Sequence, residues 1–84
     1  MNTKESQLLG RIVIDPEIMA GRPVIKGTRL TVEYILNLLG NGATPEDILQ
    51  EYRDQSLEDI LACLLFAAKA LESTESNQLL GKVA

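Results

Sequence analysis

The sequence predicts a mainly α-helical domain in which a short extended segment precedes three helices, the last two arranged as a helix-turn-helix. Three observations support this fold. β-branched residues gather in residues 11–14 and 23–26, apolar residues recur at helical spacing after residue 31, and Thr or Ser followed by acidic residues marks each helix start. We expect one domain over residues 11–72, a flexible N-terminus over residues 1–10 and a flexible tail over residues 73–84.

Length and composition are those of one small soluble domain. The 84 residues are 45% hydrophobic and 24% charged, with two tyrosines, one phenylalanine and no tryptophan. No apolar run approaches the roughly 20 residues of a membrane-spanning helix, and the N-terminus lacks a secretory pattern. The single cysteine cannot form a disulfide framework. These features indicate a cytoplasmic protein that makes no membrane contact.

The extended segment contains two short strand candidates. Residues 11–14, Arg-Ile-Val-Ile, stop at Asp15-Pro16, where the proline favours a turn. Residues 23–26, Pro-Val-Ile-Lys, are bounded by Gly21 and Gly27, which permit turns. Because two short strands are not stable alone, they require a helix to lie on or a second subunit whose strands pair with them.

The first two helices have clear start and stop signals. Thr31 caps the first helix, which ends at Gly40 or Gly42. Thr44 caps the second, where Pro45 with two acids behind it is a strong helix-start signal. The inward-facing residues are Val32, Ile35, Leu36 and Leu39 in the first helix and Ile48, Leu49 and Tyr52 in the second.

The third helix begins at the cap Ser56 and carries more apolar residues than one buried stripe needs. We assign to its buried face Leu57, Ile60, Leu61, Leu64, Ala68 and Leu71. Cys63, Leu65 and Phe66 then remain to be covered, either by the N-terminal strands or by a second chain. We favour a homodimer, with a partner or dimer interface formed by Val13, Val24, Ile25, Cys63, Leu65 and Phe66.

Charge is distributed unevenly along the chain. Residues 1–29 carry five cations and three acids, a net charge of +2, whereas residues 30–84 carry three cations and nine acids, a net charge of −6. An anion-binding surface must therefore come mainly from the first third. The candidate nucleic-acid-binding residues are Arg11, Arg22, Lys26, Arg29 and Arg53. Arg29 has the alternative role of a structural clasp near Glu33, and simple solvation is the alternative for Arg22 and Lys26.

Residue chemistry argues against catalysis. The chain has no histidine, and Cys63 lies among apolar neighbours, which is the setting of an inert thiol. The paired acids at the helix starts are explained by capping. Residues 26–28 read Lys-Gly-Thr, which is not the Gly-Lys-Ser/Thr order of a phosphate loop. We expect no enzyme activity, no catalytic residue, no metal site and no cofactor.

One motif resembles a known family. The run Gly-Arg-Pro-Val-Ile-Lys-Gly-Thr-Arg at residues 21–29, with an Asp-Pro turn before it and a Pro-Glu-Asp-Ile helix start after it, resembles a bacterial family named as a domain of unknown function, DUF433. The resemblance covers roughly residues 11–71. The matching positions are Asp15, Pro16, Gly21, Pro23, Ile25, Gly27, Thr28, Arg29, Val32, Gly42, Pro45, Ile48 and Tyr52. It implies a homeodomain-like three-helix bundle with an extended N-terminal segment.

The resemblance also implies a function, because some members are known as antitoxins of the VapB kind, paired with a PIN-like ribonuclease toxin. We therefore expect a small non-catalytic protein that neutralises such a toxin and binds its own operator DNA weakly. An acidic surface would suit a basic RNA-cleaving partner. Two alternatives stay open: a stand-alone DNA-binding regulator, and a dimeric adaptor without a nucleic-acid role. Glu58 and Asp59 would face phosphates at the place where a helix-turn-helix reads bases, which disfavours conventional readout.

Overall fold

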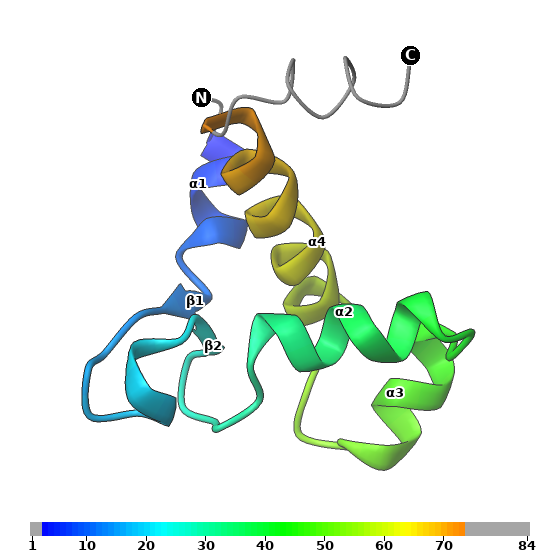
Figure 1. Cartoon of the computed structure of the whole chain (residues 1–84). Coiled ribbons are helices and arrows are strands. Elements are labelled where there is room, and N and C mark those ends of the chain that lie inside the picture. The colour runs from blue at the N-terminus through cyan, green and yellow to red at the C-terminus, as the bar shows by residue number, and fades with distance from the viewer. Residues whose placement is uncertain (1–2, 74–84) are drawn as a thin grey trace, which may run out of the picture.

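The computed structural model of the protein describes residues 3–73 (Figure 1). Within this range the chain forms four α-helices and one two-stranded sheet, which confirms the mainly α-helical class. The elements are, in chain order, α1 (Thr3–Leu9), β1 (Ile12–Val13), the 3₁₀ turn η1 (Met19–Gly21), β2 (Val24–Ile25), α2 (Val32–Gly40), α3 (Pro45–Glu51) and α4 (Leu57–Ser73). The tail predicted over residues 73–84 lies, apart from Ser73, outside the described residues.

The two predicted extended segments pair with each other. β1 and β2 run antiparallel, with Ile12 opposite Ile25. The Asp15 carboxylate accepts a hydrogen bond from the Glu17 amide at 2.9 Å, which forms the turn that the Asp-Pro sequence predicts. Val24 and Ile25 are 0% and 2% exposed, and because successive strand residues point to opposite faces, both faces of β2 are buried within this one chain.

A turn at Gly27 ties β2 to the start of α2. Gly27 has φ +79°, a left-handed conformation that glycine adopts without strain. The amide and the hydroxyl of Thr28 both donate to the Ile25 carbonyl, at 3.0 and 2.8 Å. The Val32 amide, at the start of α2, donates to the Pro23 carbonyl at 2.9 Å. The strand and the helix are therefore held together by their backbones.

The starts of α2 and α3 follow the predicted caps. The Thr31 hydroxyl accepts from the Tyr34 amide at 3.0 Å. Thr44 and Asp47 form a capping box, in which each side chain accepts from the other residue's amide, at 3.1 and 2.9 Å. Hydrogen bonding by the Thr44 backbone, and then by its side chain, lowers the pKa of Asp47 below 3.8. The cap is therefore complete at neutral pH and is lost as the pH falls through that lowered pKa.

The core lies where α2, α3 and α4 meet the face of β2 that carries Ile25. Its buried cluster consists of Ile25, Val32, Ile35, Ile48, Ile60 and Cys63. Helix α4 contacts all three other helices and β1 as well, so it is the element on which the remaining elements pack (Figure 1). Three of the six core side chains come from the first two helices predicted above, at positions predicted to face inward.

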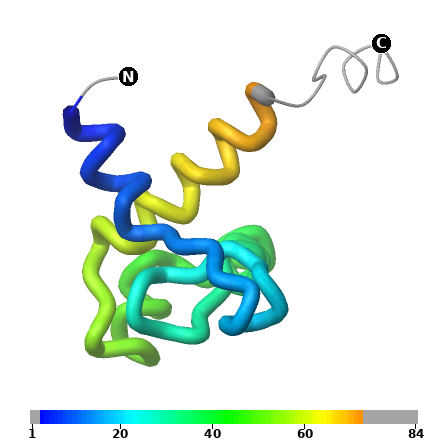
Figure 2. Tube along the Cα trace, turned by 90° about the vertical axis from the view of Figure 1, so that its left-hand side faces the viewer, coloured from blue at the N-terminus to red at the C-terminus, as the bar shows by residue number. Residues whose placement is uncertain are grey.

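Helix α1 was not expected. Residues 1–10 were predicted as a flexible N-terminus, whereas Thr3–Leu9 form a helix that contacts α4 and diverges from it away from the rest of the domain (Figure 2). The Lys69 ammonium lies 3.6 Å from the Glu5 carboxylate, so an ion pair joins the two helices. A helix of seven residues has little stability alone, and its sequence signal is correspondingly weak. Its helical state depends on α4.

Helix α4 buries a different face from the predicted one. Ile60, Ala62 and Cys63 are buried, and Phe66 packs against the core. Most of the stripe predicted to be buried is exposed instead, namely Leu57 (47%), Leu61 (39%), Leu64 (44%) and Leu71 (57%). Because α4 is apolar on both sides, periodicity alone could not tell which side faces the core.

A buried carboxylate joins the first strand region to the last helix. Asp59 is 8% exposed. Its Oδ1 accepts from the Arg11 guanidinium at 3.1 Å, and its Oδ2 accepts from the amide and the hydroxyl of Ser56 at 2.9 and 3.3 Å. Asp59 therefore caps α4 and neutralises Arg11 at the same time.

We predict that Asp59→Ala lowers the free energy of unfolding by about 2 kcal/mol, because it removes a helix cap and leaves partly buried donors without an acceptor. Glu58→Ala is the matched control, since it removes an exposed acid from the same first turn and should change stability by less than about 0.5 kcal/mol. Urea unfolding followed by circular dichroism measures both changes. Equal unfolding midpoints for the two variants would show that the Asp59 contacts contribute nothing specific.

Candidate functional site

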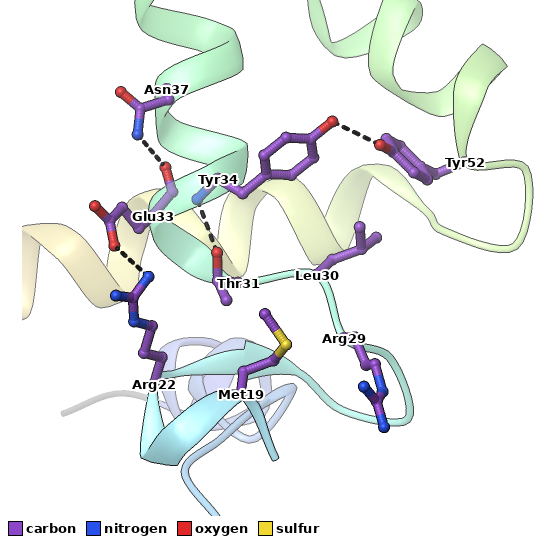
Figure 3. A pocket seen from close by; sticks show the side chains of 9 residues that line it. All are labelled: Met19, Arg22, Arg29, Leu30, Thr31, Glu33, Tyr34, Asn37 and Tyr52. Atoms are coloured by element: carbon purple, nitrogen blue, oxygen red, sulfur yellow. Dashed lines mark hydrogen bonds and ion pairs between the residues drawn. The ribbon is translucent and has the colours of Figure 1, made fainter.

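Residues of the 21–29 motif, of α2 and of the end of α3 surround a surface hollow of about 480 Å³ (Figure 3). We name it the Arg–Tyr hollow. It is lined by Met19, Arg22, Arg29, Leu30, Thr31, Glu33, Tyr34, Asn37 and Tyr52. Figure 3 shows Met19 between the two arginines, with the tyrosines on the far side from the motif. The motif therefore forms one wall of a concave surface.

Two tyrosines form the wall opposite the motif. Tyr34 comes from the first turn of α2, and Tyr52 is the residue that ends α3. Their hydroxyl oxygens are 2.7 Å apart, and their rings meet edge to face with centroids 6.2 Å apart. The pair links α2 to the end of α3 and fixes the shape of this wall.

The hydrogen bond between the tyrosines raises the pKa of Tyr52. The bond to Tyr34, followed by smaller contributions from burial and nearby groups, raises the pKa of Tyr52 above its ordinary value of 10.0. Since the pKa in the folded state is the higher one, the pair stabilises the fold fully below the unfolded-state pKa. That contribution is lost as the pH rises through the folded-state pKa.

Glu33 pairs with Arg22 rather than with Arg29. The Arg22 guanidinium lies 3.5 Å from the Glu33 carboxylate, and the two side chains are 63% and 69% exposed. An exposed pair of this kind is weak and exchanges readily with another ion. Arg29, for which we considered a role as a clasp near Glu33, points away from Glu33 in Figure 3. Within residues 3–73 it forms no ion pair, so its charge is available at the rim of the hollow.

A left-handed turn presents Met19 to the hollow. Three consecutive residues have positive φ, namely Met19 (49°), Ala20 (58°) and Gly21 (82°). Each non-glycine residue in this conformation costs roughly 1 kcal/mol. The Gly21 amide donates to the Ile18 carbonyl at 3.0 Å, which holds the turn closed. Met19 is left 39% exposed, with a flexible apolar side chain inside the hollow.

The hollow concentrates residue types that are rare in this chain. The sequence has two tyrosines, two methionines and four arginines, and the hollow contains both tyrosines, Met19 and two of the arginines. Tyrosine, methionine and arginine are enriched at protein interfaces, because they offer large contact areas together with polar groups. The lining also includes the amide of Asn37. The hollow therefore has the composition of a protein-binding surface.

The other predicted cations are placed elsewhere. Arg11 is bound to Asp59 and is therefore structural. Lys26 is exposed on the Gly27 turn, outside the lining of the hollow. Arg53 lines a separate shallow hollow beside α3, which also contains an acid. Of the five predicted cations, only Arg22 and Arg29 are brought to one site.

The predicted interface residues divide into two groups. Val24, Ile25 and Cys63 are at most 2% exposed, so they are enclosed in the chain's own core and cannot contact a second chain. The structure corrects the prediction for these three residues: Ile25 and Cys63 belong to the chain's own core cluster, and Val24 is fully buried within the chain. The half-buried residues are Val13, Leu65 and Phe66. Phe66 also lines a groove of about 490 Å³ between α2 and α4.

The thiol of Cys63 is buried, as its apolar neighbours in the sequence predict. Burial, and then the nearby Asp59 carboxylate, raise its pKa from 9.0 to about 11. It is therefore protonated at neutral pH and shielded from reagents.

No helix in the described part of the chain is long and apolar enough to span a bilayer. Within residues 3–73, no three His, Cys, Asp or Glu side chains gather as metal ligands.

Comparison with known families identifies the family of this chain. Residues 12–67, which are most of its length, match the family described as "Protein of unknown function (DUF433)". The chain belongs to the DUF433 family. No curated protein and no solved structure matches it. Every residue of the Arg–Tyr hollow lies within the matched span of this DUF433 chain, whereas α1 precedes the span and the last turns of α4 follow it.

Sequence reasoning missed four residues of the hollow: Met19, Leu30, Tyr34 and Asn37. Tyr34 carried a usable signal, because it is an aromatic residue on the polar side of a helix whose apolar face is Val32, Ile35 and Leu36. Tyr52 was assigned to the core, and it does pack against the core while its hydroxyl reaches Tyr34. Met19 had no signal, since its position depends on a left-handed turn formed without the usual glycine at its first two positions.

We predict that Tyr34→Phe lowers the pKa of Tyr52 toward the ordinary tyrosine value, because the hydrogen bond that favours the neutral phenol is removed. The variant has a single tyrosine, so titration of its ultraviolet absorbance reports Tyr52 alone. Tyr52→Phe is the matched variant and gives the titration of Tyr34 without its partner. A Tyr52 titration that keeps its raised midpoint after loss of the Tyr34 hydroxyl would contradict the assignment.

Proposed function

We propose that this DUF433 chain is a non-catalytic, antitoxin-like protein that binds and neutralises a PIN-like ribonuclease through the Arg–Tyr hollow. The observation that carries this proposal is the concentration of both tyrosines, Met19 and two arginines around one concave surface inside the family's matched span. The identity of the partner as a toxin rests on the resemblance to VapB-type antitoxins. The hollow supports the broader statement that the function is protein binding.

The chemistry of the hollow suits a partner segment with both an apolar and an anionic group. Met19, Leu30 and the Tyr34 ring supply apolar contact area. Arg29 is unpaired within the described residues, and the weak Arg22–Glu33 pair can release its arginine to a carboxylate. Arginine can hold a carboxylate with two parallel hydrogen bonds, which gives geometric specificity as well as attraction.

A ribonuclease that uses metal ions offers complementary charge of both signs. The site that holds its metal ions consists of carboxylates, for which a guanidinium is a natural counter-charge. The surface that binds RNA phosphates is basic, and the net charge of −4 on this chain favours the encounter with it. Arg22 and Arg29 would then block the acidic centre while the acidic remainder of the chain guides association.

The structure gives operator DNA binding less support. A homeodomain-like arrangement of α2, α3 and α4, which we propose from the resemblance, would direct the start of α4 toward DNA. That start carries Glu58 and Asp59, and Asp59 is fully engaged with Arg11 and Ser56. The five candidate cations are dispersed, so they form no continuous track for a phosphate backbone. We therefore leave DNA binding out of the proposed function.

The proposal is tested by co-expressing the protein with a PIN-like protein encoded beside its gene. The purified wild-type chain should suppress the ribonuclease activity of that protein at equimolar concentration. Arg22→Ala/Arg29→Ala, and separately Tyr34→Ala, should each weaken binding at least about 30-fold, the effect expected of an interface anchor. Isothermal titration calorimetry measures the affinity.

Arg53→Ala is the matched control, because it removes an exposed arginine outside the hollow and should leave affinity unchanged. Circular dichroism checks that each variant is folded. Wild-type affinity in the double arginine variant would remove the hollow from the interface. Failure of the wild-type chain to bind or inhibit the ribonuclease would end the antitoxin assignment.

A further inference from the structure

A stripe of exposed apolar side chains runs along α4 on the side away from the core. We name it the leucine seam, and it consists of Leu57, Leu61, Leu64, Ala68 and Leu71. Its four leucines are between 39% and 57% exposed. Exposed single leucines are ordinary, but five apolar residues in one line on a helix form a continuous surface.

The spacing of the seam is that of a coiled coil. Its members follow one another at intervals of four, three, four and three residues, which is the repeat of two contact positions per heptad. A stripe this narrow, with a period of 3.5 residues, is suited to pack against one other helix. A helix that only covers a globular core shows a wider stripe, and α4 has that wider stripe on its opposite side.

Helix α1 borders part of the seam without covering it. A hollow of about 420 Å³ lies between α1 and α4, and its apolar lining is Leu8, Leu61, Leu64, Leu65 and Ala68. Figure 2 shows these two helices rising from the rest of the domain. Three of the seam residues are therefore the wall of a groove as well as part of an exposed stripe.

Charges at the border of the seam indicate which helix fits. Lys4 and Glu5 line the groove, and Lys69 pairs with both Glu5 and Glu72 at 3.6 Å. A surface shaped for a strongly acidic or strongly basic partner would carry one sign of charge. This border carries charges of both signs, which suits pairing with a copy of itself.

We propose that two copies of this chain associate through their leucine seams, with α4 of one copy packed against α4 of the other. Leu64 is the middle member of the seam, so it faces the Leu64 of the second copy whether the helices run parallel or antiparallel. The seam lies outside the lining of the Arg–Tyr hollow. The inference therefore goes beyond the proposed function and does not depend on it.

Sedimentation equilibrium of the full chain tests the proposal. The wild type should behave as a dimer that dissociates on dilution, and Leu64→Asp should weaken self-association at least about 30-fold, because two carboxylates would face each other in an apolar contact. Ile14→Asp is the matched control. Ile14 is a 61% exposed apolar residue outside the seam, so its variant should dimerise like the wild type.

A charge exchange separates direct contact from loss of folding. Leu64→Asp and Leu64→Lys should each be monomeric alone and should form a heterodimer when mixed, since opposite charges then meet at the centre of the seam. Because Leu64 is exposed, both variants should retain the helical circular dichroism of the wild type. Leu57→Cys then reports orientation: only a parallel pair places the two introduced thiols together, and native Cys63 is too buried to crosslink.

A wild-type chain that stays monomeric up to millimolar concentration would overturn the proposal, as would a dimer that survives Leu64→Asp or separate variants that fail to combine. These outcomes are distinct from failure of the proposed function. Arg22→Ala/Arg29→Ala should leave dimerisation intact, and the Leu64 variants should still bind the ribonuclease. Failure in one experiment therefore does not imply failure in the other.

Discussion

The backbone contact between β2 and the start of α2 is the constraint on which this structure depends. The Val32 amide bonds to the Pro23 carbonyl, and the Ile25 amide to the Leu30 carbonyl, so a ten-residue stretch folds back on itself. Its apolar residues Val24, Ile25 and Val32 are buried, as is Thr31, whereas Lys26 and Arg29 remain exposed. Because Arg22 precedes this stretch and Arg29 lies near its end, the same fold-back brings two arginines to one hollow. The same backbone contacts therefore hold β2 against α2 and position the two arginines of the hollow.

Much of this fold could be predicted because its signals are local. The caps at Thr31 and Thr44, and the glycine turn at Gly27, act within a few residues, so their physics is visible in the sequence. The buried side of α4 and the pairing of Glu33 could not be predicted, because both depend on which distant segments meet. The inward side of α4 carries Ile60 and Cys63, which meet Ile25, Val32, Ile35 and Ile48 from segments far away in the chain. Helix α1 was missed for the same reason, since its partner is α4.

The two surfaces of the molecule differ in how they relate to the family. The Arg–Tyr hollow is built entirely from the span that matches DUF433. The leucine seam begins within that span and continues past it, and the groove beside it requires α1, which precedes the span. The seam depends in part on residues outside that span.

The bond between Arg11 and Asp59 has a consequence for the order of assembly. These residues are 48 positions apart, and their contact encloses β1, β2, α2 and α3 in a single loop. Closing so long a loop is entropically costly until the enclosed segments are compact. The Arg11–Asp59 contact itself is therefore expected to form late, whereas the pairing of β1 with β2 closes a much shorter loop. The Arg11–Asp59 bond thus joins the residue just before β1 to the first turn of α4.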